Sequence, residues 1–279
     1  YDDVAARFDT LLDVLEAENR LEYWWLTVLS PRVSACRGMG PLLVRWAAGV
    51  RAATGEEPLP LHTLALLALG WRALWRGEIE EAGAHLRSAD ASASWTGEHV
   101  IARNHALALR ALLHALRGEA APAVAIAGQR AEGFPAGYGD WGRWQAIFFA
   151  CKIASLCGDA PALRRWMGQL EDLTRAMPDL TPAQRRPLTG LRGVCAAFDG
   201  RPDDAQALWR TALGHAGETD LFGQAGELQV RLAAAALPRH PDEAAAWLQP
   251  LLRAGEGPRG ALFAAPLLPA LAAADWQGR

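Results

Sequence analysis

Hydrophobic and polar positions along this chain recur with helical spacing and in blocks of about 40 residues, a length typical of helical repeats. A short phrase repeats, in which an apolar residue, one further residue, a glycine and a charged residue precede an Ala-rich amphipathic run. Six positions fill the glycine slot: Gly38 in a weaker early copy, Gly77, Gly118, Gly158, Gly200 and Arg239. The slots are almost evenly spaced, and such a constant period indicates a helical repeat architecture.

Each phrase predicts the turn inside a helical hairpin. The glycine takes the left-handed conformation that ends the first helix. The acidic residues that follow fall in the first turn of the second helix, at the positive end of its dipole. Four prolines belong in the same first turn, where a missing N–H is no loss: Pro122, Pro161, Pro202 and Pro241.

Small residues flank the turns at fixed places. Seven residues before the glycine stand Gly70, Ala111, Cys151 and Gly193, and five after it stand Ala82, Ala123, Leu163 and Ala205. Small side chains at these places predict that the two helices of a hairpin approach closely.

The period of the apolar positions predicts an all-α fold, because no alternating run is long enough for a strand. The chain is expected to be a single helical-repeat domain, with N-terminal helices or a cap over 1–38, repeat hairpins over 39–254 and a C-terminal capping helix over 255–279. The predicted helices are Asp2–Asn19, Arg20–Leu29, Pro41–Ala53, Leu61–Arg76, Glu78–Ala89, Glu98–Arg117, Ala120–Ala131, Trp141–Cys157, Pro161–Met177, Pro182–Phe198, Pro202–His215, Leu221–Leu237, Pro241–Arg253 and Ala261–Ala274.

One stretch resembles the tetratricopeptide family, whose pattern has a small residue in the first helix, a hairpin glycine and an alanine in the second helix. The matching positions are Leu66, Leu69 and Gly70, then Gly77, Ala82, Leu86 and Ala89. The resemblance implies an α-α superhelix, a solenoid of antiparallel helix–turn–helix hairpins. The period of this chain is longer than that of the standard repeat, which is about 34 residues.

Composition narrows the function classes. The 279 residues are 51% hydrophobic and 21% charged, with a formal net charge of −3. No basic field is available to attract nucleic acid or an anionic membrane, so we expect no direct binding of either. No run reaches 18 apolar residues and no signal-peptide pattern opens the chain, which predicts a cytoplasmic protein.

Catalytic and metal-binding patterns are missing from the sequence. It has no phosphate-binding loop, no H-E-x-x-H and no G-x-S-x-G. The four cysteines (Cys36, Cys151, Cys157 and Cys195) form no C-x-x-C pair, and the seven histidines do not recur at ligand spacing. We therefore expect no enzyme, no cofactor and no metal site.

Tryptophan is unusually abundant, with 12 residues, several of them on the first helices of the predicted hairpins. These helices line the concave wall of a hairpin stack. Two interpretations stay open: the aromatics pack hairpin on hairpin, or they line a ligand groove. Arg110 and Arg192 stand at apolar places of the pattern and must find a carboxylate or point into a groove. The candidate ligand-binding residues of the concave face are Trp71, Asn104, His105, Trp141, Trp144, Gln145, Phe148, Lys152 and Arg192.

The style of the repeats from Pro41 to Leu252, with degenerate Ala/Leu/Arg-rich hairpins, resembles the sensor region of large LuxR-type transcriptional regulators. The resemblance implies a domain of a bacterial regulator that binds an effector or a protein partner on its concave face and takes part in self-association. It also implies that this chain is an excised piece of a longer protein. The alternative is a free-standing tetratricopeptide scaffold that binds a peptide segment of a protein partner.

Overall fold

The computed structural model describes residues 2–18, 40–54, 60–92, 100–135, 139–177, 182–214, 224–253 and 259–273. The chain forms two compact units, unit 1 (Tyr1–Leu113) and unit 2 (His114–Arg279). All regular elements in the described ranges are helical, which confirms the predicted all-α fold. The predicted helix Arg20–Leu29 lies outside these ranges, and the single-domain organisation with its two caps stays a prediction.

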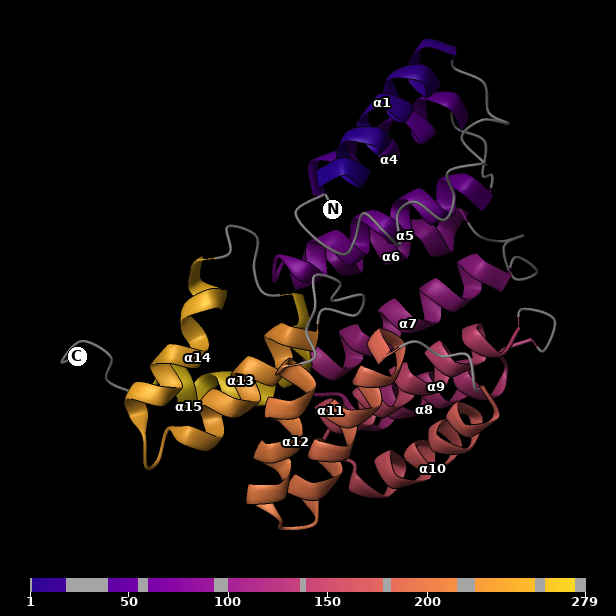
Figure 1. The fold of residues 1–279 in the computed structure, drawn as a ribbon. Helices are drawn as coiled ribbons and strands as arrows, with labels where there is room; N and C mark the ends of the chain where they lie inside the picture. The colour runs from indigo at the N-terminus through magenta and orange to yellow at the C-terminus, as the bar shows by residue number, and fades with distance from the viewer. Residues whose placement is uncertain are drawn as a thin grey trace. The chain divides into compact units, whose positions relative to one another are not determined.

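Unit 1 contains helices that pack on their neighbours in chain order (Figure 1). Helix α1 packs on α4, α4 on α5, and α5 on α6. Their bounds are α1 (Asp2–Glu18), α4 (Gly40–Thr54), α5 (Pro60–Trp75) and α6 (Ile79–Ser92), followed by α7 (Val100–Leu116). A cluster that includes Leu12, Trp46 and Leu61 forms the core shared by α1, α4 and α5.

Unit 2 repeats the same packing through successive hairpins. Its elements are α8 (Ala120–Glu132), α9 (Gly139–Leu156), α10 (Ala160–Ala176), α11 (Pro182–Phe198), α12 (Pro202–Gly214), α13 (Gln224–Ala236), α14 (Pro241–Arg253), the 3₁₀ helix η3 (Arg259–Leu267) and α15 (Leu268–Ala272). Helices α9 and α10, α11 and α12, and α13 and α14 pack as hairpins. The first helices also contact one another, α9 with α11 and α11 with α13. This is the contact pattern of an α-α superhelical repeat.

The four predicted hairpin glycines have the expected left-handed backbone. Their φ angles are +79° at Gly77, +79° at Gly118, +71° at Gly158 and +73° at Gly200. At Gly77 the amide donates to the Leu74 carbonyl (2.9 Å), and the next amide, of Glu78, donates to the Ala73 carbonyl (2.9 Å). The same pair of hydrogen bonds closes the other three turns, and it satisfies carbonyls that the helix end leaves open.

The fifth turn, where Arg239 replaces glycine, closes differently. There the His240 amide donates to the Ala236 carbonyl (2.7 Å), and so does the Arg239 amide (3.0 Å). The next helix nevertheless begins as predicted, with Pro241 as its first residue. The repeat therefore tolerates loss of the glycine by changing the hydrogen bonds of the turn.

Small residues do bring the hairpin helices together. All eight flanking positions are buried. A Cβ atom added at Gly70 would lie 3.5 Å from the Ala82 carbonyl oxygen, and one at Gly193 would lie 3.1 Å from that of Ala205. Gly193 thus allows the backbones of α11 and α12 to approach more closely than alanine would, whereas the distance at Gly70 is an ordinary contact that alanine could also make.

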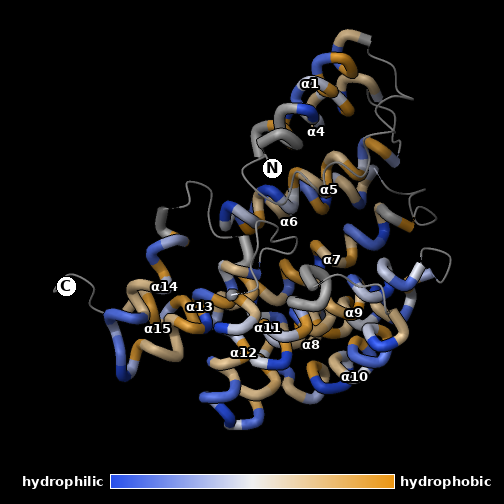
Figure 2. The backbone as a smooth tube through the Cα atoms, viewed as in Figure 1, coloured by the Kyte–Doolittle hydropathy of each residue, from blue (hydrophilic) through white to orange (hydrophobic). Residues whose placement is uncertain are grey.

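First and second helices differ in burial. Most residues of α5 and α9 are buried, whereas α10 buries only Leu163, Trp166, Met167 and Leu170. Figure 2 shows the corresponding contrast between a largely hydrophobic α5 and the hydrophilic positions along α10. In these hairpins the first helix is the more buried of the two, and the second helix has more residues that face solvent.

The C-terminal end departs from the expected helix Ala261–Ala274. The segment forms η3 with a non-helical Ala264 (φ −117°), followed by the five-residue α15. Pro266 lies inside η3 and Pro269 at the start of α15, and proline removes the backbone donors that a longer α-helix needs. Both elements pack against α13.

Candidate functional site

A stripe along one face of α9 carries four of the nine predicted site residues. Trp141, Trp144, Phe148, Lys152 and Ser155 recur at intervals of three and four, which places them on one helix face. Trp144 stacks on Trp141 (5.1 Å between ring centroids) and on Phe148 (5.2 Å). The stripe therefore begins with three stacked aromatic rings and ends with polar groups.

Trp144 is a packing residue in this structure. Its side chain is fully buried, and its indole Nε1 donates to Thr174 Oγ1 of α10 at 2.8 Å. Thr174 passes this bond on by donating to the Leu170 carbonyl (2.6 Å). The indole thus fixes α9 against the second helix of its own hairpin, as the packing interpretation expected.

The polar end of the stripe is a buried ionic network. Lys152 forms an ion pair with Glu227 of α13, and the two side chains are only 3% and 2% exposed. Arg231, one turn further along α13, donates from Nε to Glu227 Oε1 at 2.9 Å. Since removing such charges from water costs several kcal/mol per ion, the network depends on this close pairing.

Arg231 also joins three further elements of unit 2. Its Nη2 donates to Ser155 Oγ of α9 (2.8 Å) and to the Phe263 carbonyl of η3 (3.3 Å), and its guanidinium carbon lies 5.9 Å from the Trp209 ring of α12. Burial lowers the pKa of Arg231 to about 10. The guanidinium therefore remains charged at neutral pH.

Phe263 of η3 completes the cluster. Its ring lies edge-on to Phe149 of α9 (6.2 Å between centroids), and Lys152 Nζ lies 4.8 Å from its centroid. The Arg130 guanidinium carbon lies 5.2 Å from the centroid of the Phe149 ring. Cations over aromatic rings are held by the ring quadrupole, so rings and charges here stabilise each other.

The remaining predicted residues lie elsewhere. Gln145 is half-buried on α9, and Arg192 of α11 is exposed and pairs with Glu171 of α10 (2.9 Å). Trp71, Asn104 and His105 belong to unit 1. There Trp71 stacks on Trp75 (5.7 Å), the buried Asn104 amide donates to the Val100 carbonyl (2.9 Å), and His105 is half-buried. The structure thus places Trp141, Trp144, Phe148 and Lys152 on one face of α9, while Arg192 pairs with a carboxylate of α10.

Both arginines at apolar places of the repeat pattern contact a carboxylate. Arg110 donates to both oxygens of Asp90 at 2.7 Å, as Arg192 does to one oxygen of Glu171. Of the two outcomes expected for these arginines, the structure shows pairing with a carboxylate.

Sequence reasoning missed Glu227, Arg231 and Phe263. A signal existed for the first two, because Glu227 directly precedes the largely apolar run Leu228–Ala236 of the predicted helix, and Arg231, four residues later, interrupts it. A helix that buries such a run must bury those charges or pair them. Phe263 carried no comparable signal, since a lone aromatic in an apolar segment is ordinary core composition.

The described ranges contain no group of three or more His, Cys, Asp or Glu that could hold a metal ion. Burial raises the pKa of the Cys151 thiol far above its ordinary value, and it also raises those of Cys157 and Cys195. These thiols are therefore protonated at neutral pH and weak as nucleophiles. No helix in the described part of the chain is long and apolar enough to cross a membrane.

Comparison with known proteins finds no protein-family model that matches this chain and no curated protein with significant sequence similarity.

Proposed function

We propose that this chain is a ligand-sensing helical-repeat domain of a bacterial transcriptional regulator. We further propose that it binds its effector on the first-helix face of unit 2, the face formed by the first helices of its hairpins, α9, α11 and α13. The observation that carries the proposal is the buried network of Lys152, Glu227 and Arg231 between α9 and α13. Replacing a buried ion network by well-packed apolar residues is often neutral or stabilising. A wall that only held the stack together would not need these charges.

The arrangement suits binding better than catalysis. The network is buried and fixes the polar end of α9, whose polar groups and aromatic rings together have the composition typical of small-molecule sites. Half-buried Trp141 and Gln145 on the same helix supply a polar and aromatic rim that a ligand can reach. The link to LuxR-type regulators, the cytoplasmic location and the self-association rest on the repeat style alone.

A thermal-shift screen of the isolated chain against sugars, amino acids, carboxylates and nucleotides tests the proposal. A ligand at 100 times its Kd should stabilise the fold by about 2.7 kcal/mol. The Kd of that ligand should rise at least tenfold in Trp141→Ala or Gln145→Ala. It should stay unchanged in Gln169→Ala, whose side chain is exposed on α10.

Two results would count against this site. If none of these compounds raises the melting temperature, the proposal of a small-molecule effector fails. If a compound raises it equally in the wild type and in the α9 variants, the chain senses a ligand elsewhere.

One observation favours the alternative, a tetratricopeptide scaffold that binds a peptide of a protein partner. The first-helix face of unit 2 already receives a peptide segment, η3, through a ring and a backbone carbonyl. A wall with these contacts is suited to peptide chains, and a screen that includes peptides distinguishes the two functions.

A further inference from the structure

The segment Arg259–Leu267 lies on the first-helix face of unit 2, where it contacts α9 and α13. In a hairpin stack this face is the wall on which repeat proteins of this architecture bind their partners. The wall near Lys152 is therefore covered by a segment of the chain itself.

The segment is held by contacts that a peptide from another source could also make. The Phe263 ring meets Phe149 edge-on, with 6.2 Å between the ring centroids, and its own centroid lies 4.8 Å from Lys152 Nζ. Its backbone carbonyl accepts from Arg231 at 3.3 Å. The site thus selects for an aromatic side chain and adds a main-chain contact that any peptide can supply.

The two charged groups that contact the segment are also held by residues outside it. Arg231 is oriented by Glu227 (2.9 Å) and Ser155 (2.8 Å), and Lys152 is paired with Glu227. Such preorganisation reduces the entropy that a docking segment loses. The buried charges of unit 2 consequently have a role that packing alone does not explain, because they aim donors at the docked carbonyl.

Apart from Phe263, the segment contributes smaller side chains. Ala264 is buried among Val230, Ala233 and Ala244 of the α13–α14 hairpin, and Leu267 packs against the same cluster. The 3₁₀ conformation has poorer hydrogen-bond geometry than an α-helix. Phe263 is therefore the principal anchor of the segment.

We propose that the face formed by Phe149, Lys152 and Arg231 is an acceptor site for a short apolar peptide with one aromatic anchor, and that residues 259–267 fill it in cis. A partner segment of the same chemistry gains the site when residues 259–267 leave it. That second step rests on the proposed binding function, whereas the docking in cis does not.

The test uses the full chain and a fluorescein-labelled peptide with the sequence of residues 259–267, followed by fluorescence anisotropy. Phe263→Ala removes the anchor and should bind the peptide at least tenfold more tightly than the wild type, whose site is filled. Phe149→Ala combined with Phe263→Ala should lose this gain, and so should a peptide with alanine in place of its phenylalanine. Phe198→Ala, an exposed phenylalanine on α11, is the matched control and should behave as wild type.

Equal peptide affinity in the wild type and in a folded Phe263→Ala chain would overturn the proposal. A second measurement needs no substitution, in case Phe263→Ala unfolds. Excess unlabelled peptide added to the wild type should speed amide hydrogen exchange in residues 259–272 while α9–α12 stay protected. Unchanged exchange in that segment, or exchange of the whole unit together, would show that it is only part of the core.

Failure of the acceptor site and failure of the sensor function are separable outcomes. The peptide experiment can succeed when no small effector is found in the thermal-shift screen. Conversely, an effector that depends on Trp141 can be found when the peptide does not bind.

Discussion

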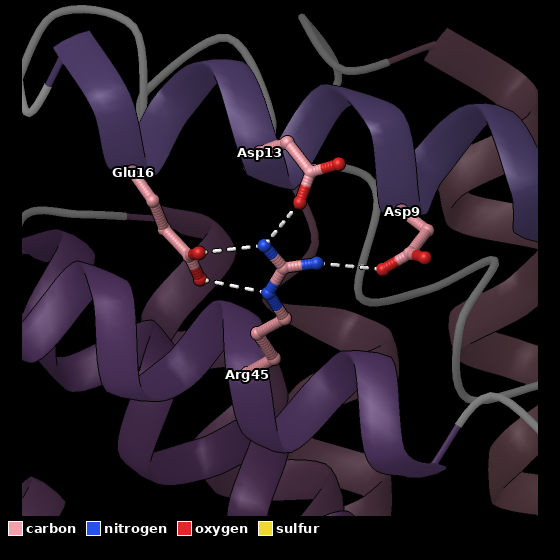
Figure 3. A network of polar contacts seen from close by, with 4 residues as sticks. All are labelled: Asp9, Asp13, Glu16 and Arg45. Carbon is pink, nitrogen blue, oxygen red and sulfur yellow. Dashed lines mark hydrogen bonds and ion pairs between the residues drawn. The ribbon is translucent and has the colours of Figure 1, made fainter.

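Each unit contains an ion network that ties non-adjacent segments together, and the two networks differ in exposure. In unit 1, Arg45 of α4 reaches Asp9 (2.6 Å), Asp13 (2.5 Å) and Glu16 (2.6 Å) of α1 (Figure 3), and all four side chains are at least 30% exposed. In unit 2, Glu227 is 2% exposed and holds Lys152 and Arg231. The same chemistry therefore acts in water in one unit and in a low-dielectric interior in the other.

The difference determines what each network contributes. The hydrogen bonds that Arg45 donates to Glu16 and Asp13 raise its pKa, yet exposed pairs gain little because water and salt screen them. Within unit 2 the charges are locked together, because each one left unpaired would retain its full desolvation cost. The exposed network fixes an orientation at small energetic effect, and the buried one makes three residues mutually dependent.

The largest expected effect comes from Glu227→Ala. It leaves Lys152 and Arg231 buried without their shared carboxylate and should lower the free energy of unfolding by roughly 3–5 kcal/mol in urea titrations. Adding Lys152→Met should recover part of the loss. Glu132→Ala breaks an exposed pair with Arg165 of the same unit and should cost only about 0–1 kcal/mol. A loss near that of Glu132→Ala would contradict the buried network.

Trp144→Ala should be nearly as destabilising, because it empties a fully buried site and breaks the bond to Thr174. The expected loss is about 3–5 kcal/mol in the same titration. Trp141→Ala, on the half-buried ring that stacks on it, should cost less. If Trp144→Ala left stability unchanged while weakening a ligand, the groove interpretation of this tryptophan would be correct instead.

Two glycines inside first helices, Gly70 in unit 1 and Gly193 in unit 2, should differ less strongly in their effect on stability when replaced by alanine. A Cβ at Gly193 would meet the Trp209 indole and the Ala205 carbonyl, which have little room to move, so Gly193→Ala should cost about 1–3 kcal/mol. At Gly70 the nearest atom is Leu109 Cδ2 (2.7 Å), the end of a side chain that can change rotamer. Helix propensity there favours alanine by about 0.5–1 kcal/mol, so Gly70→Ala should be close to neutral. Thermal melts that reverse this order would contradict the packing described for the two hairpins.

Arg45→Ala should lower the melting temperature only slightly, and the decrease should depend on the salt concentration. The loss of melting temperature in low salt should largely vanish in 1 M NaCl, where the Debye length is about 3 Å. Asp13→Asn, which removes one of the three carboxylate charges, should produce a smaller shift with the same salt dependence. A large decrease that salt does not alter would place this network among the buried ones.

Local patterns were sufficient to predict the hairpins. The left-handed turns at Gly77, Gly118, Gly158 and Gly200 depend on backbone sterics within a few residues, and so do the helix starts at Pro202 and Pro241. The small residues at Gly70 and Gly193 could also be read correctly, because one helical period fixes which positions face the partner helix.

Which polar groups meet was decided only by the tertiary structure. Arg231 and Ser155 are 76 residues apart, and Phe263 reaches them from a segment whose helix type was itself predicted wrongly. The sequence alone determined the spacing of Trp141, Trp144, Phe148 and Lys152 on one helix face. Whether that face is open or buried depends on how each hairpin is displaced relative to the next. These displacements add up over several repeats, and no short stretch of the sequence specifies them. For this reason the repeat could be predicted, while the closing of α13 and η3 over α9 could not.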